Sequence, residues 1–250
     1  MKEGSENHCV DAEFLWVHLS ETASSEYDGG RFALAAGHWQ KAYEIAQDFE
    51  DHDPRIGSSL NNVAVALRTN GNFWEAEQCY GRAMANWKTA SKWVDGMHLG
   101  QRARSSLFHL RMEQKHRSQY KRIALAEYNK LLSAGFAGTL NNLAELFYVT
   151  NRPRDAKELY VRALGERLGA MGERDSGVAI IRKNIARLSD VDLTKTDQTP
   201  IPSQRSIKTS LFASQATLRG WIVGKPAQFT DEGRLMAAIL LSYLIDHSCL

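Results

Sequence analysis

An all-α fold, in which antiparallel helix pairs stack into a solenoid, is predicted for this 250-residue chain by three observations. Residues that favour helix, such as alanine, leucine and the long charged side chains, dominate its periodic stretches. Only 5 prolines and 18 glycines interrupt them. In addition, the run LNNVA at residues 60–64 recurs as LNNLA at residues 140–144. An internal repeat of this kind is typical of stacked helical units.

The repeat continues downstream at the same offset of 80 residues. The coinciding pairs are Ala76 with Ala156, Tyr80 with Tyr160, Arg82 with Arg162, and Ala83 with Ala163. Two shorter offsets add copies, because residues 37–42 precede the similar run 71–76 by 34, and residues 184–186 follow 142–144 by 42. Since 80 is about two units of roughly 40, we expect a divergent copy in between, around residues 103–132.

Each unit is expected to be a pair of helices with complementary apolar stripes. In the last clear copy, the residues at helical spacing are Ala156, Leu159, Tyr160, Ala163, Leu164 and Leu168. The small alanines allow the two helices to approach closely. Gly71 suits a helix end, and Asn72 followed by Glu75 resembles a capping box that begins the next helix.

The runs LNNVAVALRTNGNFWEAEQCYGRAM (60–84) and LNNLAELFYVTNRPRDAKELYVRAL (140–164) resemble tetratricopeptide repeats. They are most similar to the roughly 42-residue variety found in kinesin light chains. The resemblance covers about residues 30–188 and implies a right-handed solenoid that binds a protein or peptide partner. Two departures are Asn151 and Pro153, which stand where the family has glycine and an aromatic residue.

The resemblance also implies a binding groove, lined by the first helix of each pair. Asn62, Asn142 and Asn184 match the family position that bonds the backbone of a bound peptide, since an amide both donates and accepts. The residues expected by helical spacing to share that face are Val65, Arg68, Glu145 and Tyr148. The alternative is that the asparagines bond only neighbouring helices.

The net charge of +2 hides an uneven distribution. Residues 1–53 carry 3 basic and 12 acidic side chains, whereas residues 98–122 carry 7 Lys or Arg and one Glu. The basic residues are Arg102, Arg104, Arg111, Lys115, Arg117, Lys121 and Arg122. They form either a solvated helix pair or a surface for an acidic peptide or polyanion. Nucleic acid is the weaker candidate because few aromatic residues accompany them, and a homo-oligomer pairing this segment with the acidic end is another.

No catalytic, cofactor or metal site is predicted. The chain has no Gly-rich phosphate loop, nucleophile elbow or HExxH motif. Its three cysteines, Cys9, Cys79 and Cys249, are too far apart for a paired metal motif and odd in number, which favours a reducing compartment. The N-terminus lacks the pattern of a signal peptide, and the apolar run 235–245 is shorter than the roughly 20 residues of a membrane span. These features predict a cytoplasmic protein.

Four regions are expected along the chain. They are an N-terminal helical extension (1–29), the solenoid (30–188), a polar linker with two prolines (189–206) and a C-terminal helical tail or cap (207–250). The last expected helix is apolar on most sides, so it needs a surface to pack against. Packing on the solenoid is favoured, because terminal repeats require a cap. The other possibilities are a dimer contact, occupation of the groove and a membrane-surface helix.

Overall fold

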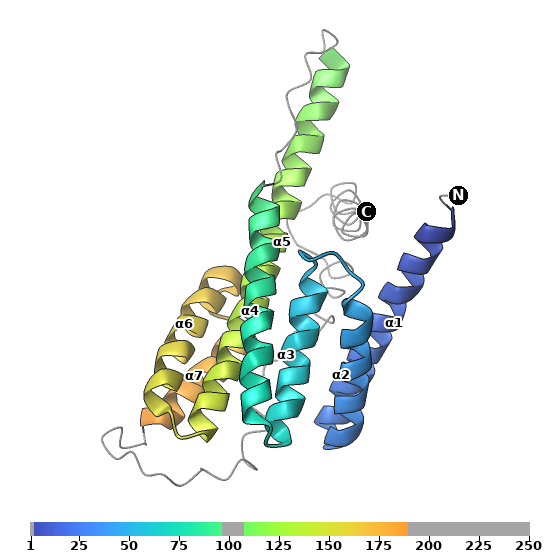
Figure 1. Ribbon diagram of the computed structural model, residues 1–250. Helices are drawn as coiled ribbons and strands as arrows, with labels where there is room; N and C mark the ends of the chain where they lie inside the picture. The colour runs from blue at the N-terminus through green and yellow to red at the C-terminus, as the bar shows by residue number, and fades with distance from the viewer. Residues whose placement is uncertain (1–2, 97–107, 190–250) are drawn as a thin grey trace.

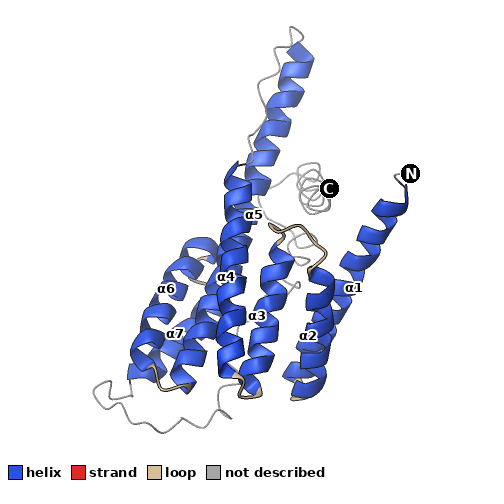
Figure 2. Cartoon of the chain, viewed as in Figure 1, coloured by secondary structure: helices blue, strands red, loops and turns tan. Residues whose placement is uncertain are grey.

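The computed structural model of the chain describes residues 3–96 and 108–189. All regular structure in these two ranges is helical, as Figure 2 shows. The helices are α1 (Glu3–Asp28), α2 (Phe32–Ala46), α3 (Pro54–Thr69), α4 (Phe73–Gly96), α5 (Phe108–Val149), α6 (Pro153–Met171) and α7 (Ser176–Ser189). Consecutive helices pack in pairs, so the predicted all-α solenoid is confirmed. The linker beyond Ser189 and the tail lie outside the described residues, and the four-region division stays a prediction.

The helices of the second pair, α3 and α4, are joined by a tight turn around Gly71. Gly71 adopts a φ of +83°, which favours glycine. Its N–H donates to the Arg68 carbonyl at 3.1 Å, and the Asn72 N–H donates to the Leu67 carbonyl at 2.9 Å. These two bonds form a Schellman motif, which satisfies the last carbonyls of α3 and turns the chain back into α4. Gly71 therefore ends the helix as predicted.

The same turn occurs at the other two pairs. Between α5 and α6, Asn151 has a φ of 59°, and the Arg152 N–H donates to the Phe147 carbonyl at 2.7 Å. Asparagine is the usual substitute for glycine at this position, and Pro153 fits the first helical position that follows. Between α1 and α2 the left-handed residue is Gly30, with a φ of 77°. The departures at Asn151 and Pro153 therefore leave the repeat geometry intact.

The first pair begins earlier than the 34-residue offset indicates. That offset aligned Gly37 with Gly71, but Gly37 lies inside α2, and the turn equivalent to Gly71 is at Gly30. An offset of 41 therefore relates the first two pairs, and it matches residues 19–23 (LSETA) with 60–64 (LNNVA). The 34-residue alignment is wrong because it compared a helical glycine with a glycine in a turn.

Small residues lie where the paired helices cross. The equivalent alanines, each 0 % exposed, are Ala23, Ala64 and Ala144 in the first helices and Ala35, Ala76 and Ala156 in the second. The aromatic rings of Trp39, Tyr80 and Tyr160 fill the adjoining position of the second helices. With no side chain beyond Cβ at the crossing, the helices can approach closely enough for these rings to be enclosed.

The divergent copy predicted around residues 103–132 is not a separate helix pair. Residues 108–149 form one continuous helix of 42 residues, and the upper part of α5 extends beyond the other helices in Figure 1. Leu125, Tyr128 and Leu132 of α5 pack against the lengthened end of α4 in one apolar cluster. The extra residues therefore lengthen α4 and α5 instead of adding a unit. We call residues 108–124 the α5 arm.

The ring of Trp87 on α4 packs beside Gly135, a glycine through which α5 continues as a helix. A Cβ atom on Gly135 would lie 2.7 Å from the Trp87 ring, and one on Gly57 of α3 would lie 3.0 Å from the same ring. The indole N–H of Trp87 donates to Thr139 Oγ1 at 3.1 Å. Both glycines thus make room for one buried ring at the junction of α3, α4 and α5, and the glycine does not end the helix.

We expect Gly135→Ala to lower the free energy of unfolding by about 1–3 kcal/mol, because the added methyl group overpacks the Trp87 site. Gly81 on the exposed side of α4 is the matched control, since nothing lies within 4 Å of its Cβ position. Gly81→Ala should stabilise by about 0.5–1 kcal/mol through helix propensity. Urea unfolding measures both. Equal effects of the two substitutions would contradict the close packing of Trp87.

Candidate partner-binding surface

The first helices of the pairs form a continuous layer, bonded from one helix to the next. We call α1, α3, residues 134–149 of α5, and α7 the first-helix layer. The indole of Trp16 on α1 donates to Ser59 Oγ on α3 at 2.7 Å. Amide bonds join α3 to α5 and α5 to α7. Because each first helix also packs on the second helix before it, these bonds fix how successive pairs align.

Five asparagines carry the bonds between α3, α5 and α7. Asn184 Nδ2 donates to Asn141 Oδ1 at 2.8 Å, and Asn141 Nδ2 donates to Asn142 Oδ1 at 3.2 Å. Asn142 Nδ2 donates to Asn61 Oδ1 at 3.0 Å, and Asn61 Nδ2 donates to Asn62 Oδ1 at 3.1 Å. All five side chains are at most 2 % exposed. A buried amide must be hydrogen-bonded to be tolerated, so this asparagine ladder holds the three helices in one register.

A family model named tetratricopeptide repeat matches residues 18–89. The helix pairs within residues 18–89 are therefore similar to tetratricopeptide repeats. The match runs from within α1 into α4 and therefore includes the pair α1–α2. Comparison with curated proteins gave no significant match. The likeness to the kinesin-light-chain variety stays a prediction.

One helical turn beyond the ladder, the first-helix layer carries a charged cluster around the buried Glu145. The Arg187 guanidinium of α7 donates to the two Glu145 carboxylate oxygens at 3.0 and 3.1 Å, and the Tyr160 hydroxyl donates to the same carboxylate. Glu145 is 0 % exposed. Burial, and then the negative charge of Glu145, raise the pKa of Tyr160, so this phenol stays protonated and donates its hydrogen bond. The Arg187 guanidinium also lies 4.8 Å from the centre of the Tyr148 ring.

Arg68 extends this charged cluster to α3. Its side chain is 5 % exposed, and its charge is attracted by Glu145. Burial raises the pKa of Tyr80 even though the Arg68 charge opposes the shift. Arginine and glutamate are almost never this deeply buried unless they are paired. The cluster and the ladder together make a polar surface across three helices of the layer.

All seven predicted groove residues lie on the first-helix layer. Six are at most 5 % exposed, namely Asn62, Val65, Arg68, Asn142, Glu145 and Asn184, while Tyr148 is partly exposed. The bonds between asparagines of neighbouring helices, which were the alternative prediction, are present. Contact between these residues and a partner stays a prediction.

Sequence reasoning missed three members of this surface: Asn61, Asn141 and Arg187. Each of the first two is the other half of an Asn-Asn doublet, and it accepts the bond from the next helix. Arg187 follows Glu145 by 42 residues, the same spacing that separates Asn184 from Asn142. Applying the repeat offset to the whole face, instead of to the asparagines alone, would have found it.

The predicted basic segment divides between two parts of the chain. Arg102 and Arg104 lie outside the described residues. The backbone of the other five (Arg111, Lys115, Arg117, Lys121 and Arg122) belongs to the α5 arm. Their role stays a prediction.

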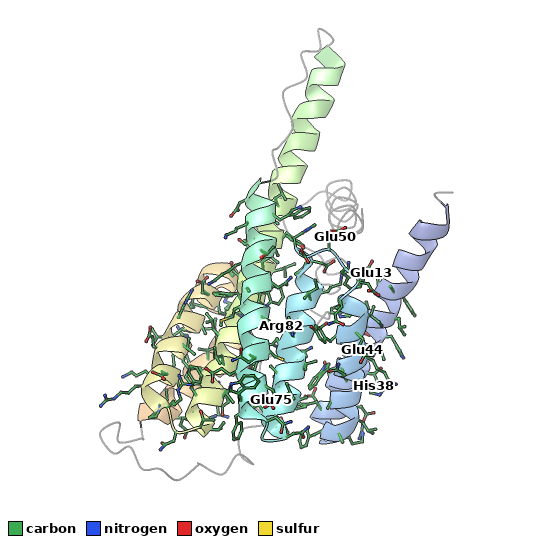
Figure 3. All side chains as sticks on the ribbon, viewed as in Figure 1. Glu13, His38, Glu44, Glu50, Glu75 and Arg82 are labelled. Atoms are coloured by element: carbon green, nitrogen blue, oxygen red, sulfur yellow. The ribbon has the colours of Figure 1, made fainter. Side chains whose placement is uncertain are left out.

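Acidic side chains are placed mainly on the N-terminal pairs. Figure 3 shows Glu44 on α2 and Glu50 in the connection to α3. Glu13 of α1 pairs with the buried Arg55, at 3.1 Å between Oε1 and a guanidinium nitrogen. Arg82 of α4 points toward α2, where its guanidinium donates to the Tyr43 hydroxyl at 2.5 Å. The acidic balance predicted for residues 1–53 thus includes exposed carboxylates, Glu44 and Glu50 among them.

Among the side chains that the structure describes within residues 3–96 and 108–189, no group of three or more His, Cys, Asp and Glu is placed to hold a metal ion. No helix described in those ranges combines the length and apolar composition that a bilayer crossing requires. The predictions that the chain is not an enzyme and needs no cofactor are left untested by these findings.

Proposed function

We propose that this tetratricopeptide-repeat protein is a cytoplasmic adaptor or regulatory scaffold that holds a peptide segment of a protein partner against the first-helix layer. Tetratricopeptide repeats are protein-interaction modules, and stacked repeats offer an extended binding face. The observation that carries the proposal is the row of amides on successive first helices. An extended peptide exposes a donor and an acceptor at every residue, and amides can match both.

The charged cluster gives the proposed site a preference for partner segments that carry negative charge. The named groups of the cluster are two guanidiniums, those of Arg68 and Arg187, and the carboxylate of Glu145, which attracts both. A partner segment with a carboxylate could replace part of the Glu145 contact with a guanidinium. We therefore propose an acidic or C-terminal peptide segment as the partner. Arg187 is the partly exposed member of the cluster, whereas Arg68 and Glu145 are buried.

The double variant Asn62→Ala with Asn142→Ala tests this proposal. Each lost hydrogen bond to a peptide costs about 0.5–1.5 kcal/mol, so affinity should fall several-fold or more. The partner is first isolated with the intact chain as bait, and its affinity is then measured by calorimetry at a temperature where circular dichroism shows both variants folded.

The matched control is Asn61→Ala with Asn141→Ala. These residues belong to the same ladder, but each lies one residue earlier, about 100° around its helix. If the partner contacts Asn62 and Asn142, only the first double variant should weaken binding strongly. Equal weakening by both pairs would mean that the ladder only holds the helices together, and unchanged affinity in both would place the partner on another surface.

The α5 arm supports a second candidate function, the binding of an acidic protein or another polyanion. It extends beyond the helix pairs and its sequence carries five Lys or Arg residues. Replacing Arg111, Lys115 and Arg117 with glutamine should flatten the salt dependence of partner binding, because each charge contact releases counterions. Affinity measured from low to moderate salt checks this. An unchanged slope would mean that these basic residues are exposed to solvent and do not contact the partner.

A further inference from the structure

A groove lies between α5 and α6, where α5 continues past the end of α6 into the α5 arm (Figure 1). Its volume is about 540 Å³, within the range of about 300–1,000 Å³ that is usual for ligand-binding clefts. One wall is formed by residues between 126 and 133 of α5, and the other by residues between 162 and 170 of α6. The first-helix layer uses residues 134–149 of α5, so the groove is a separate surface.

The repeat relates this groove to a part of the preceding pair. The offset of 80 residues matches 126–133 with 46–53, and 162–170 with 82–90. The two pairs differ in the first of these segments. Residues 47–53 are the non-helical connection from α2 to α3, whereas the equivalent residues of α5 are helical.

In the preceding pair, the connection from α2 to α3 lies against α4. The Asn86 side chain of α4 donates to the Asp51 carbonyl at 2.9 Å and accepts from the Gly57 N–H at 2.8 Å. The rings of His52 and Trp93 stack with their centres 4.1 Å apart. The second helix of this pair therefore binds a non-helical segment of polypeptide, partly through main-chain groups.

On α6, the equivalent positions line the groove. Glu166 stands where α4 has Asn86, and its side chain is partly exposed. Because residues 127–133 are helical, they do not cross onto α6 as the connection crosses onto α4. A Cβ atom on Gly165 or Gly169 would meet nothing within 4 Å, so another main chain can approach this wall closely.

We propose that this α5–α6 groove binds an extended segment of a partner protein, in the way that α4 binds residues 47–53. The Glu166 carboxylate can accept a main-chain N–H, as Asn86 accepts the N–H of Gly57. The Arg162 guanidinium can donate to a main-chain carbonyl. An extended segment offers both kinds of group, whereas a helix uses its own N–H and carbonyl groups internally.

The charges in the groove favour main-chain contacts over a strongly charged segment. Neither Arg162 nor Glu166 forms an ion pair within the part of the chain that the structure describes. Lys130 on the α5 wall is already paired with Glu127 at 2.7 Å. The Asn129 side-chain oxygen accepts no hydrogen bond from the described residues. One positive and one negative group thus remain for a partner, and they match the acceptors and donors of a main chain.

The test uses a phage-displayed library of random peptides about eight residues long, which at about 3.3 Å per residue can cross the groove. The library is depleted on the full-length Gly169→Phe variant and then selected on the parent chain. The added ring occupies the groove, so the selected peptides should bind this variant more weakly than the parent by roughly tenfold or more. Gly81→Phe on α4 is the matched control and should bind as the parent does, because its Cβ position is equally open.

Point substitutions identify how a selected peptide is held. Glu166→Ala and Arg162→Ala should each weaken its binding by roughly two- to tenfold, the effect of one lost hydrogen bond. Lys157→Ala, at an exposed position of α6 outside the groove, should not. The double variant Asn62→Ala with Asn142→Ala should also leave this affinity unchanged, so that a failure of the site on the first-helix layer is distinguished from a failure here.

Urea unfolding checks that each variant is folded, and Gly165→Phe replaces Gly169→Phe if the latter is not. The proposal is overturned if no peptide survives the depletion, or if the surviving peptides bind Glu166→Ala and Arg162→Ala as tightly as the parent. Circular dichroism supplies the remaining measurement. A peptide that becomes helical when it binds would assign the groove to a helix and would also overturn the proposal.

Discussion

Replacing Glu145 with alanine is expected to lower the free energy of unfolding by about 3–5 kcal/mol, one of the largest effects of any single substitution on the described surface. The carboxylate is 0 % exposed and accepts hydrogen bonds from Arg187 and Tyr160. Without it, the buried Arg68 and the partly exposed Arg187 lose their shared negative partner. A buried charge that loses its partner costs far more than a surface charge, because water cannot replace the lost interaction.

The matched control is Glu127→Ala, on the same helix. Glu127 pairs with Lys130 at 2.7 Å near solvent, and an exposed pair of this kind contributes about 0–1 kcal/mol. Urea unfolding of both variants, followed by circular dichroism, measures the difference. If the two substitutions cost the same, the buried cluster does not stabilise the junction of α3, α5 and α7. Adding Arg187→Met to Glu145→Ala should recover part of the loss, because it removes one of the two guanidiniums.

The turns between paired helices could be predicted from the sequence, but only in part. Gly71 follows an apolar stripe and precedes a capping residue, a pattern that indicates a helix end by local chemistry alone. Asn151 makes the same turn without glycine, because asparagine also tolerates a positive φ. The first pair was misaligned because residues 20 and 21 are Ser and Glu where later copies have two asparagines. The shared turn at Gly30 was the better guide to its register.

The long helix α5 could not be predicted from periodicity. Its lower half belongs to a repeat, whereas the arm follows no repeat spacing, and a glycine at position 135 favours an interruption. The structure shows that a ring from another helix uses the space at this glycine. Packing between helices distant in sequence thus outweighs local propensity here, and no window of the sequence around position 135 contains Trp87.

The candidate site could be located from the sequence, but the contacts of its residues could not. Helical spacing places Asn62, Val65 and Arg68 on one face of a helix. It does not show that Asn62 accepts from its own neighbour Asn61 or that Asn142 donates across to α3. These bonds depend on the distance between helices that are about 80 residues apart in the chain. Spacing also does not show how deeply each of these side chains is buried.

The ladder gives a separate prediction that concerns Asn141. Asn141 accepts from Asn184 at 2.8 Å and donates to Asn142 at 3.2 Å, so it joins α7 to the rest of the layer beside the Arg187–Glu145 pair. In Asn141→Ala both neighbouring amides lose this partner, and a buried amide that loses a hydrogen bond costs about 1–3 kcal/mol. We expect a loss of stability in that range or above it.

The loss should be concentrated at α7, because the bond between Asn142 and Asn61 does not involve the changed side chain. Hydrogen exchange should therefore become faster in α7 while α3 keeps its protection, and thermal melts should shift downward. Asn70→Ala is the control, since Asn70 is exposed at the end of α3 with ordinary helical backbone angles, and it should change stability by less than about 0.5 kcal/mol. The contrary result is hydrogen exchange in α7 that stays as slow in Asn141→Ala as in the parent. It would mean that Arg187 and the apolar contacts are enough to hold α7, and that the ladder does not set the register of the layer.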